Sequence, residues 1–158
     1  MNATHLHLLI THLPIFGSIF GGLVLAHGIW TSSKQTKVAA YNLFILSSIG
    51  AVVAYLTGES AEESVEHLQG VLEGNIKAHE DFALYALVGL IALGISAIVG
   101  LIVTLRQSVY TRTLAYMILI LSLSSFILVA RTGYLGGQIR HTELNTTNTE
   151  VTTDKDSD

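Results

Sequence analysis

The sequence predicts an all-α membrane protein, a four-transmembrane-helix up-and-down bundle, and composition and apolar pattern both support this fold class. Charged residues make up only 13 % of the chain and hydrophobic residues 50 %, whereas soluble domains carry about 25 % charged residues. The apolar residues also form four long blocks instead of an amphipathic pattern. Each block approaches the roughly 20 residues that a helix needs to cross a hydrocarbon core about 30 Å thick.

The four blocks define one transmembrane domain, residues 1–144. The spans are expected at about 8–30, 38–56, 82–105 and 114–135. Short loops join the first span to the second and the third to the fourth, so each of these pairs should be antiparallel. The second span is expected to stop at Thr57-Gly58, a helix-ending signal. Residues 145–158 are acidic and Thr-rich with almost nothing to bury, and they are predicted to form a disordered tail.

Charge asymmetry between the loops predicts the orientation. Lys34, Lys37, Arg106 and Arg112 lie in or beside the two short loops, which contain no acid. All 12 acidic residues lie between the second and third spans or after the fourth. Because short loops with positive residues stay on the cytoplasmic side, both termini and the 58–81 connection are predicted to be extracytoplasmic.

The 58–81 connection carries a helical pattern of its own. Ser60 and Glu63 have the spacing of a capping box, and Val65, Leu68 and Ile76 fall on one helical face. The sequence therefore predicts a short amphipathic interfacial helix at about 60–76, lying across the outer mouth of the bundle.

Up-and-down threading should bring most of the histidines to one membrane face. The six that belong to this face are His5, His7, His12, His67, His79 and His141. Imidazole is the commonest ligand for transition metals in proteins and a usual axial ligand of haem iron. The alternative is that these side chains only reach the interface, as other amphipathic side chains do. Because three different spans contribute histidines, a shared cofactor site is favoured for the set.

The candidate ligands differ in their local context. His12 is followed by Pro14, so the first span should kink or restart there and place His12 at the break, inside the apolar layer. His5 shares the face of His12, whereas His7 points elsewhere. His79 precedes a face with Ala83 and Ala86, and His141 ends a face with Ala130 and Gly137; these small residues could make room for a flat macrocycle. His67 falls opposite the apolar stripe of the predicted interfacial helix.

Two arginines and several carboxylates complete the predicted site. Arg131 and Arg140 could hold haem propionates, because guanidinium binds carboxylates in bidentate fashion, or they could pair with Glu59 or Glu63. In a non-haem site, His12, His79 and His141 would act with Glu59, Glu63 or Glu80 as ligands of iron, zinc or copper ions. The chain has no cysteine, which excludes disulfides, iron–sulfur ligation and covalent c-type haem.

Four segments resemble a known family. They are HLHLLITHLPI from His5, TGESAEE from Thr57, HEDFA from His79 and GGQIRH ending at His141. They are similar to a family of small four-helix bacterial membrane proteins long described as a domain of unknown function. Some relatives are fused to Rieske or cytochrome c domains. The resemblance implies a redox setting, haem b, and ligands at His12, His79 and His141. It departs at Leu13 and Thr142, where many relatives carry an aromatic residue and a glycine.

Three functions remain open from the sequence. The first is a b-type cytochrome of the bacterial inner membrane with one haem, or two, exchanging electrons with a quinol or an extracytoplasmic cytochrome. The second is a mono- or dinuclear metal site, which could make the protein an enzyme. The third is an accessory subunit of a respiratory complex. An electron carrier is favoured over a catalyst acting alone. The expected partners are lipid, a second copy or a larger complex, and no nucleic acid.

Overall fold

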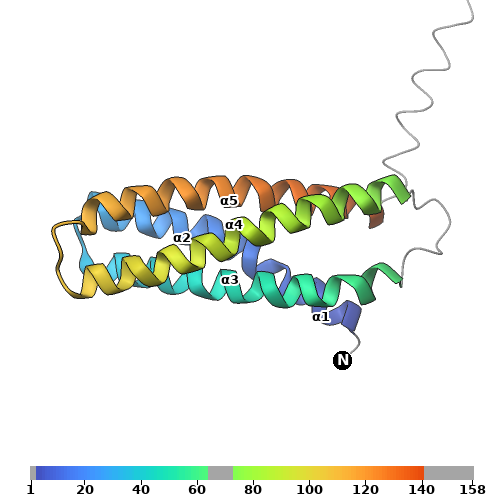
Figure 1. Ribbon diagram of the computed structural model, residues 1–158, viewed down its shortest axis with the longest axis horizontal. Helices are drawn as coiled ribbons and strands as arrows, with labels where there is room; N and C mark the ends of the chain where they lie inside the picture. The colour runs from blue at the N-terminus through green and yellow to red at the C-terminus, as the bar shows by residue number, and fades with distance from the viewer. Residues whose placement is uncertain (1–2, 64–72, 141–158) are drawn as a thin grey trace, which may run out of the picture.

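The computed structural model describes residues 3–63 and 73–140. These residues form five helices and no strand: α1 (Ala3–Ile10), α2 (His12–Trp30), α3 (Lys34–Glu63), α4 (Glu73–Leu105) and α5 (Thr111–Arg140). Helices α2 to α5 run along the long axis of the molecule, with the α2–α3 and α4–α5 connections at the same end (Figure 1). The predicted up-and-down four-helix arrangement is therefore confirmed.

Four helical segments are long and apolar enough to cross a membrane. They are His5–Trp30, Lys34–Gly58, Gly74–Leu105 and Thr111–Ile139. Large apolar side chains such as Phe20, Ile49 and Ile120 are exposed on the outside, as expected for a surface that faces lipid. The buried core inside the bundle contains Tyr41, Phe44 and Leu93.

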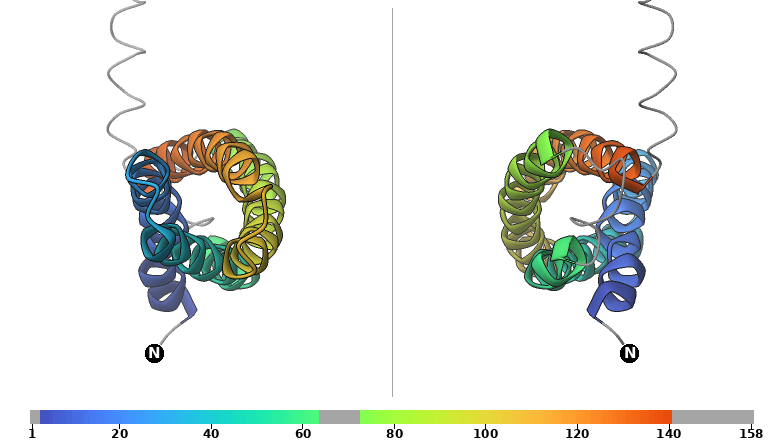
Figure 2. Two further views of the ribbon diagram at one scale, coloured as in Figure 1. Left: turned by 90° about the vertical axis from the view of Figure 1, so that its left-hand side faces the viewer. Right: turned by 90° about the vertical axis from the view of Figure 1, so that its right-hand side faces the viewer.

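The helices close into a ring. Helix α3 packs against α2 and α4, and α5 packs against α4 and α2, so that the four are seen end-on around a common axis (Figure 2). Both tight connections contain one residue in the left-handed region, Ser32 and Gln107, each with a φ of 55°. This conformation ends a helix by letting the backbone turn back on the last carbonyls, which makes the α2–α3 and α4–α5 pairs antiparallel.

The first span is broken near Pro14, as the sequence predicts. Helix α1 ends at Ile10 and α2 begins at His12, because proline lacks the N–H that would bond Ile10 and its ring crowds that carbonyl. Helix α1 packs against α3 and extends past the ring of the other helices (Figure 2). The break thus gives α1 a direction that differs from that of α2.

Glycines bring α2 and α3 close together beyond the break. A Cβ on Gly17 would lie 2.7 Å from Cβ of Ser47, and one on Gly21 would lie 2.5 Å from Cε1 of Phe44. The hydroxyls of Ser18 and Ser47 both donate to the Pro14 carbonyl, at 2.7 and 3.3 Å. Gly17 and Gly21 therefore permit close packing of α2 on α3.

The structure differs from two predicted boundaries, the end of the second helix and the interfacial helix after it. The predicted helix end at Thr57-Gly58 does not occur, because α3 continues to Glu63, although the apolar span itself ends at Gly58. The hydroxyl of Thr57 is satisfied within the helix by the Val53 and Ala54 carbonyls. The predicted interfacial helix at about 60–76 is not shown: residues 60–63 extend α3, residues 73–76 begin α4, and the part between lies outside the described residues. The predicted tail, 145–158, also lies outside them.

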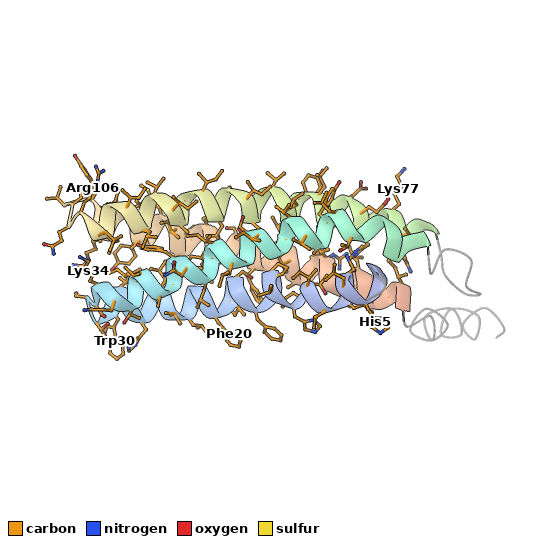
Figure 3. All side chains as sticks on the ribbon, turned by 90° about the horizontal axis from the view of Figure 1, so that it is seen from below. His5, Phe20, Trp30, Lys34, Lys77 and Arg106 are labelled. Carbon is orange, nitrogen blue, oxygen red and sulfur yellow. The ribbon has the colours of Figure 1, made fainter. Side chains whose placement is uncertain are left out.

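The two ends of the bundle differ in their polar residues. Lys34, Arg106 and Trp30 lie at the end with the tight connections, and His5 and Lys77 lie at the opposite end (Figure 3). The side chain of Lys34 reaches across this first end to the Leu105 carbonyl, at 3.4 Å. The fold therefore separates the short basic loops from the end where α1 and the start of α4 lie.

Candidate histidine site

His7 projects from α1 toward α3. Its ring is half-buried, and its Nδ1 atom lies 2.9 Å from the carbonyl oxygen of Ala54 and 3.3 Å from the hydroxyl oxygen of Thr57. Gly58 lies beside the ring of His7, so that a Cβ on Gly58 would be 3.7 Å from Cε1 of His7. The imidazole of the first span is thus oriented by the second span.

His79 is held in the corresponding way by the other helix pair. Its ring, on α4, is half-buried, and its Nδ1 atom lies 3.0 Å from the Thr132 carbonyl on α5. The ring packs against Gly136, where a Cβ would lie 3.1 Å from Cε1 and 3.2 Å from Nδ1. Any side chain at position 136 would press on the imidazole, so glycine is needed at this close approach.

The two rings share one hydrogen-bonding state. A backbone carbonyl only accepts hydrogen bonds, so Nδ1 of both His7 and His79 must carry a hydrogen. In the neutral ring, Nε2 then keeps a free lone pair. No residue that the structure describes is hydrogen-bonded to either Nε2 atom. An imidazole whose Nδ1–H is held by a carbonyl is the usual form of a metal-ligating histidine.

The two histidines lie at the same end of the bundle, His7 beside the last turns of α3 and His79 beside the last turns of α5. The side chain of Glu80 is exposed, so it lies outside the half-buried layer of the two rings. His7 and His79 therefore form a pair at one end of the bundle, contributed by the first and third spans.

His5 and His12 are placed differently from His7. Both are exposed, and Nδ1 of His12 bonds the Leu8 carbonyl of the preceding turn, at 2.9 Å. The ring of His12 stacks on Phe16 with its centroid 6.0 Å away. His7 and His12 point in different directions, as predicted, and it is His7 that points to α3, because the break before Pro14 turns α1 relative to α2. Cofactor binding by His12 stays a prediction.

A signal for the position of His7 was present in the second span. Ala54 and Gly58 are small residues four positions apart near the end of that span, and residues at this spacing share one helix face. Small residues on a membrane helix allow a neighbouring group to approach closely. The imidazole that fills this face is His7, which could have been paired with it before the structure was known.

Several predicted site residues fall wholly or partly outside the described part of the chain. His67 and His141 lie outside it. Glu59 and Glu63 belong to α3 and Arg140 ends α5, but the structure describes the backbone of these three and not their side chains. These predicted ligands and propionate contacts stay predictions.

Arg131 lies on the outer surface between α4 and α5. Its guanidinium carbon is 5.6 Å from the ring centroid of Phe82 and 5.4 Å from that of Tyr134. The side chain is exposed, and stacking on aromatic faces leaves the N–H edges of a guanidinium free for an anion. Its role toward a propionate stays a prediction.

Residues 3–63 and 73–140 contain no group of three or more His, Asp or Glu side chains that could hold a metal ion. A zinc or non-haem iron site needs at least three protein ligands. The predicted sets that include His141, Glu59 or Glu63 are not covered by this finding. Among the described side chains, the arrangement offers a pair of imidazoles.

The chain was compared with protein-family models, with curated proteins and with solved structures, and none of them matches it. The family resemblance and its implied redox setting therefore stay expectations that rest on the four sequence segments alone.

Proposed function

We propose that the protein is a membrane-embedded b-type cytochrome that binds one haem through His7 and His79 and carries single electrons. The observation that supports this proposal is the matched state of the two rings. Each Nδ1–H is fixed by a carbonyl of a neighbouring helix, at 2.9 and 3.0 Å. Each ring thus keeps its Nε2 lone pair for iron.

The number of donors favours haem over a bare metal ion. A porphyrin supplies four nitrogen ligands of its own, so the protein needs to add only one or two axial ligands. Two imidazoles from different helices meet that need. The non-haem alternative needs a third or fourth protein ligand, and within the described residues no such group is placed.

The helix surfaces near the two rings also fit a flat group. A Cβ on Gly137 would meet nothing within 4 Å, although the residue is half-buried. Gly58 leaves only ordinary contact distance to His7. Glycines beside a histidine make space that larger side chains would fill.

Haem would supply a one-electron redox centre at this end of the bundle. The protein's own residues would bind the iron, fix the ring orientation and keep bulk water from the half-buried layer. From the loop charges, we further propose that this end is extracytoplasmic, in the bacterial inner membrane. A lipid-soluble quinol and an extracytoplasmic cytochrome are the proposed redox partners.

The absorption spectrum of the purified full chain tests the proposal. The protein is produced with a haem precursor in the medium, and haem is counted by the pyridine haemochrome method. We expect a Soret band, α and β bands after reduction, and one haem per chain. His7→Ala and His79→Ala should each reduce the haem content at least tenfold or change the spectrum to that of an iron with one axial ligand.

Matched controls come from the exposed histidines. His12→Ala and His27→Ala remove imidazoles that are both exposed, and they should leave the haem content and the spectrum unchanged. The proposal fails if His7→Ala and His79→Ala keep a normal spectrum at full stoichiometry. It also fails if the wild-type chain holds no haem but binds iron, zinc or copper ions stoichiometrically.

A further inference from the structure

The imidazole of His12 lies in an unusual environment. It lies seven residues after His5, where the first span begins, and it starts α2 directly after the break in that span. Its side chain is exposed and faces outward from the bundle. A polar ring on the lipid-facing side of a span is costly, and such residues mark functional sites when a suitable partner can be named.

Two phenylalanines extend the ring of His12 into a stacked row. The centroids of His12 and Phe16 are 6.0 Å apart with an angle of 25° between the planes, and those of Phe16 and Phe20 are 5.6 Å apart with an angle of 10°. Phe16 and Phe20 are 49 % and 52 % exposed. A flat molecule dissolved in the membrane could pack against these rings with favourable aromatic contacts.

The hydrogen-bonding state of His12 limits what this molecule can be. Its Nδ1 atom is bonded to the Leu8 carbonyl at 2.9 Å, so Nδ1 carries the hydrogen and the neutral ring presents Nε2 as an acceptor. No hydrogen bond from the described part of the chain reaches Nε2. The occupant must therefore bring a hydrogen-bond donor into the apolar layer.

We propose that the His12–Phe16–Phe20 face binds the head group of a lipid-soluble hydroquinone. A phenolic hydroxyl of the hydroquinone donates to Nε2 of His12, and its ring packs against Phe16. The hydroquinone meets all three conditions, because it dissolves in lipid, is planar and carries an O–H donor. The oxidised quinone has only carbonyl acceptors, so the neutral imidazole favours the reduced form.

A second copy of the chain meets these conditions less well. In a twofold contact the same face would lie opposite itself. The large hydrophobic side chains exposed around it, Leu9, Leu13, Phe16 and Phe20, contain no hydrogen-bond donor. The hydroxyl of Thr11 already donates to the Leu8 carbonyl. Self-association through this face would leave Nε2 of His12 unpaired in a dry interface, at the cost of an unsatisfied polar atom.

A hydroquinone at this face would be the electron donor of the proposed cytochrome, and this part of the inference rests on the proposed function. Binding itself needs no haem and can be measured separately. The full chain, labelled with ¹⁵N-histidine, is placed in lipid nanodiscs without oxygen and titrated with a decyl-substituted 1,4-benzohydroquinone. We expect the Nε2 resonance of His12 to move in the direction of an accepted hydrogen bond, and to saturate.

Variants and a modified probe sharpen the measurement. Loss of one hydrogen bond should weaken binding about tenfold in His12→Phe, and loss of the stacking ring should weaken it about fivefold in Phe16→Leu. His27→Phe is the matched control, because His27 is also exposed but meets Trp30 edge-on, at an angle of 74°. It should bind as the wild type does. The O,O-dimethyl ether of the probe has no hydroxyl and should not shift Nε2.

Three results would overturn the inference. The first is equal affinity of the wild type and His12→Phe, and the second is an equal shift with the dimethyl ether. The third is crosslinking of two copies of a Phe20→Cys variant by a short bis-maleimide that persists with saturating hydroquinone, which would assign the face to a second copy. Binding to His79→Ala at normal affinity is expected even if that variant lacks haem. Failure of the haem proposal and failure of this one are therefore distinguishable.

Discussion

The two ends of the bundle differ in the side chains that join their helices. At the end with the tight connections, Gly28 packs on the backbone of Lys37, Tyr41 and Phe44 are fully buried, and Lys34 and Thr111 bond carbonyls of α4. At the other end, two imidazoles join the helices: His7 reaches the Ala54 carbonyl and His79 reaches that of Thr132. In lipid, close van der Waals packing is the main force between helices, so half-buried imidazoles bonded between helices at one end indicate a purpose other than stability.

The largest expected effect lies at Gly136. A valine there would place Cβ about 3.1 Å from the His79 ring and add two methyl groups, so the imidazole must leave its bond to Thr132. We expect Gly136→Val to lower the haem content at least tenfold, measured by pyridine haemochrome. Gly133→Val is the matched control on the same helix, because a Cβ there would meet only Ile15, at 4.0 Å. Equal haem loss in both variants would contradict the assignment.

The next largest effect tests the packed region. Gly21→Ala would place Cβ 2.5 Å from the Phe44 ring, so α2 and α3 must separate or Phe44 must shift. We expect the free energy of unfolding to fall by about 1–3 kcal/mol, the usual cost of overpacking, measured by denaturant titration in detergent. Gly89→Ala has ordinary contacts, the nearest at 3.4 Å, and should change stability by less than about 1 kcal/mol. Haem content should stay normal in both.

A smaller effect is expected at Thr57. Its hydroxyl oxygen lies 3.3 Å from Nδ1 of His7, but the Ala54 carbonyl holds the same nitrogen at 2.9 Å. Thr57→Val should therefore keep the haem and weaken its binding by about 1 kcal/mol, or roughly fivefold, in a competition assay with apomyoglobin. Thr31→Val is the control, because the hydroxyl of Thr31 bonds only the His27 carbonyl of its own helix. An unchanged haem affinity in Thr57→Val would remove Thr57 as a positioning residue.

The smallest effect is expected at Tyr41. Its hydroxyl and that of Thr104 are buried without a hydrogen-bond partner among the described residues. Because an unpaired buried hydroxyl contributes nothing favourable, Tyr41→Phe should leave the unfolding free energy unchanged or raise it by up to about 1 kcal/mol. A clear loss of stability would mean that the Tyr41 hydroxyl makes a hydrogen bond that stabilises the end with the tight connections. The contrast between close packing at this end and bonded imidazoles at the other would then disappear.

Much of the fold could be predicted from the residues alone. The apolar blocks and short loops identified four spans and their antiparallel order, and Pro14 identified the break in the first span. The helix end predicted at Thr57-Gly58 does not occur, and the reason is physical. A glycine costs a helix only about 1 kcal/mol relative to alanine, and the packing of His7 beside Gly58 favours a continuous helix there.

The placement of the candidate histidines could be predicted only in part. The position of His79 follows from a regular helix and from the small residues near it. The direction of His7 relative to His12 could not be predicted, because helical periodicity relates two residues only along an unbroken helix. Across Thr11 and Pro14 that relation is lost, and the direction of α1 follows from its packing on α3. No local pattern in the first span encodes this packing.

The carbonyl that orients each histidine belongs to the same half of the chain as the histidine, and this affects how the protein can assemble. His7, in the first span, is oriented by α3, the second span, and His79, in the third span, is oriented by α5, the fourth. Each half of the chain can therefore set its own imidazole as soon as its hairpin has entered the bilayer, before the other half exists. Haem insertion would then be the step that joins two prepared halves, and the two hairpins produced as separate polypeptides should assemble around it.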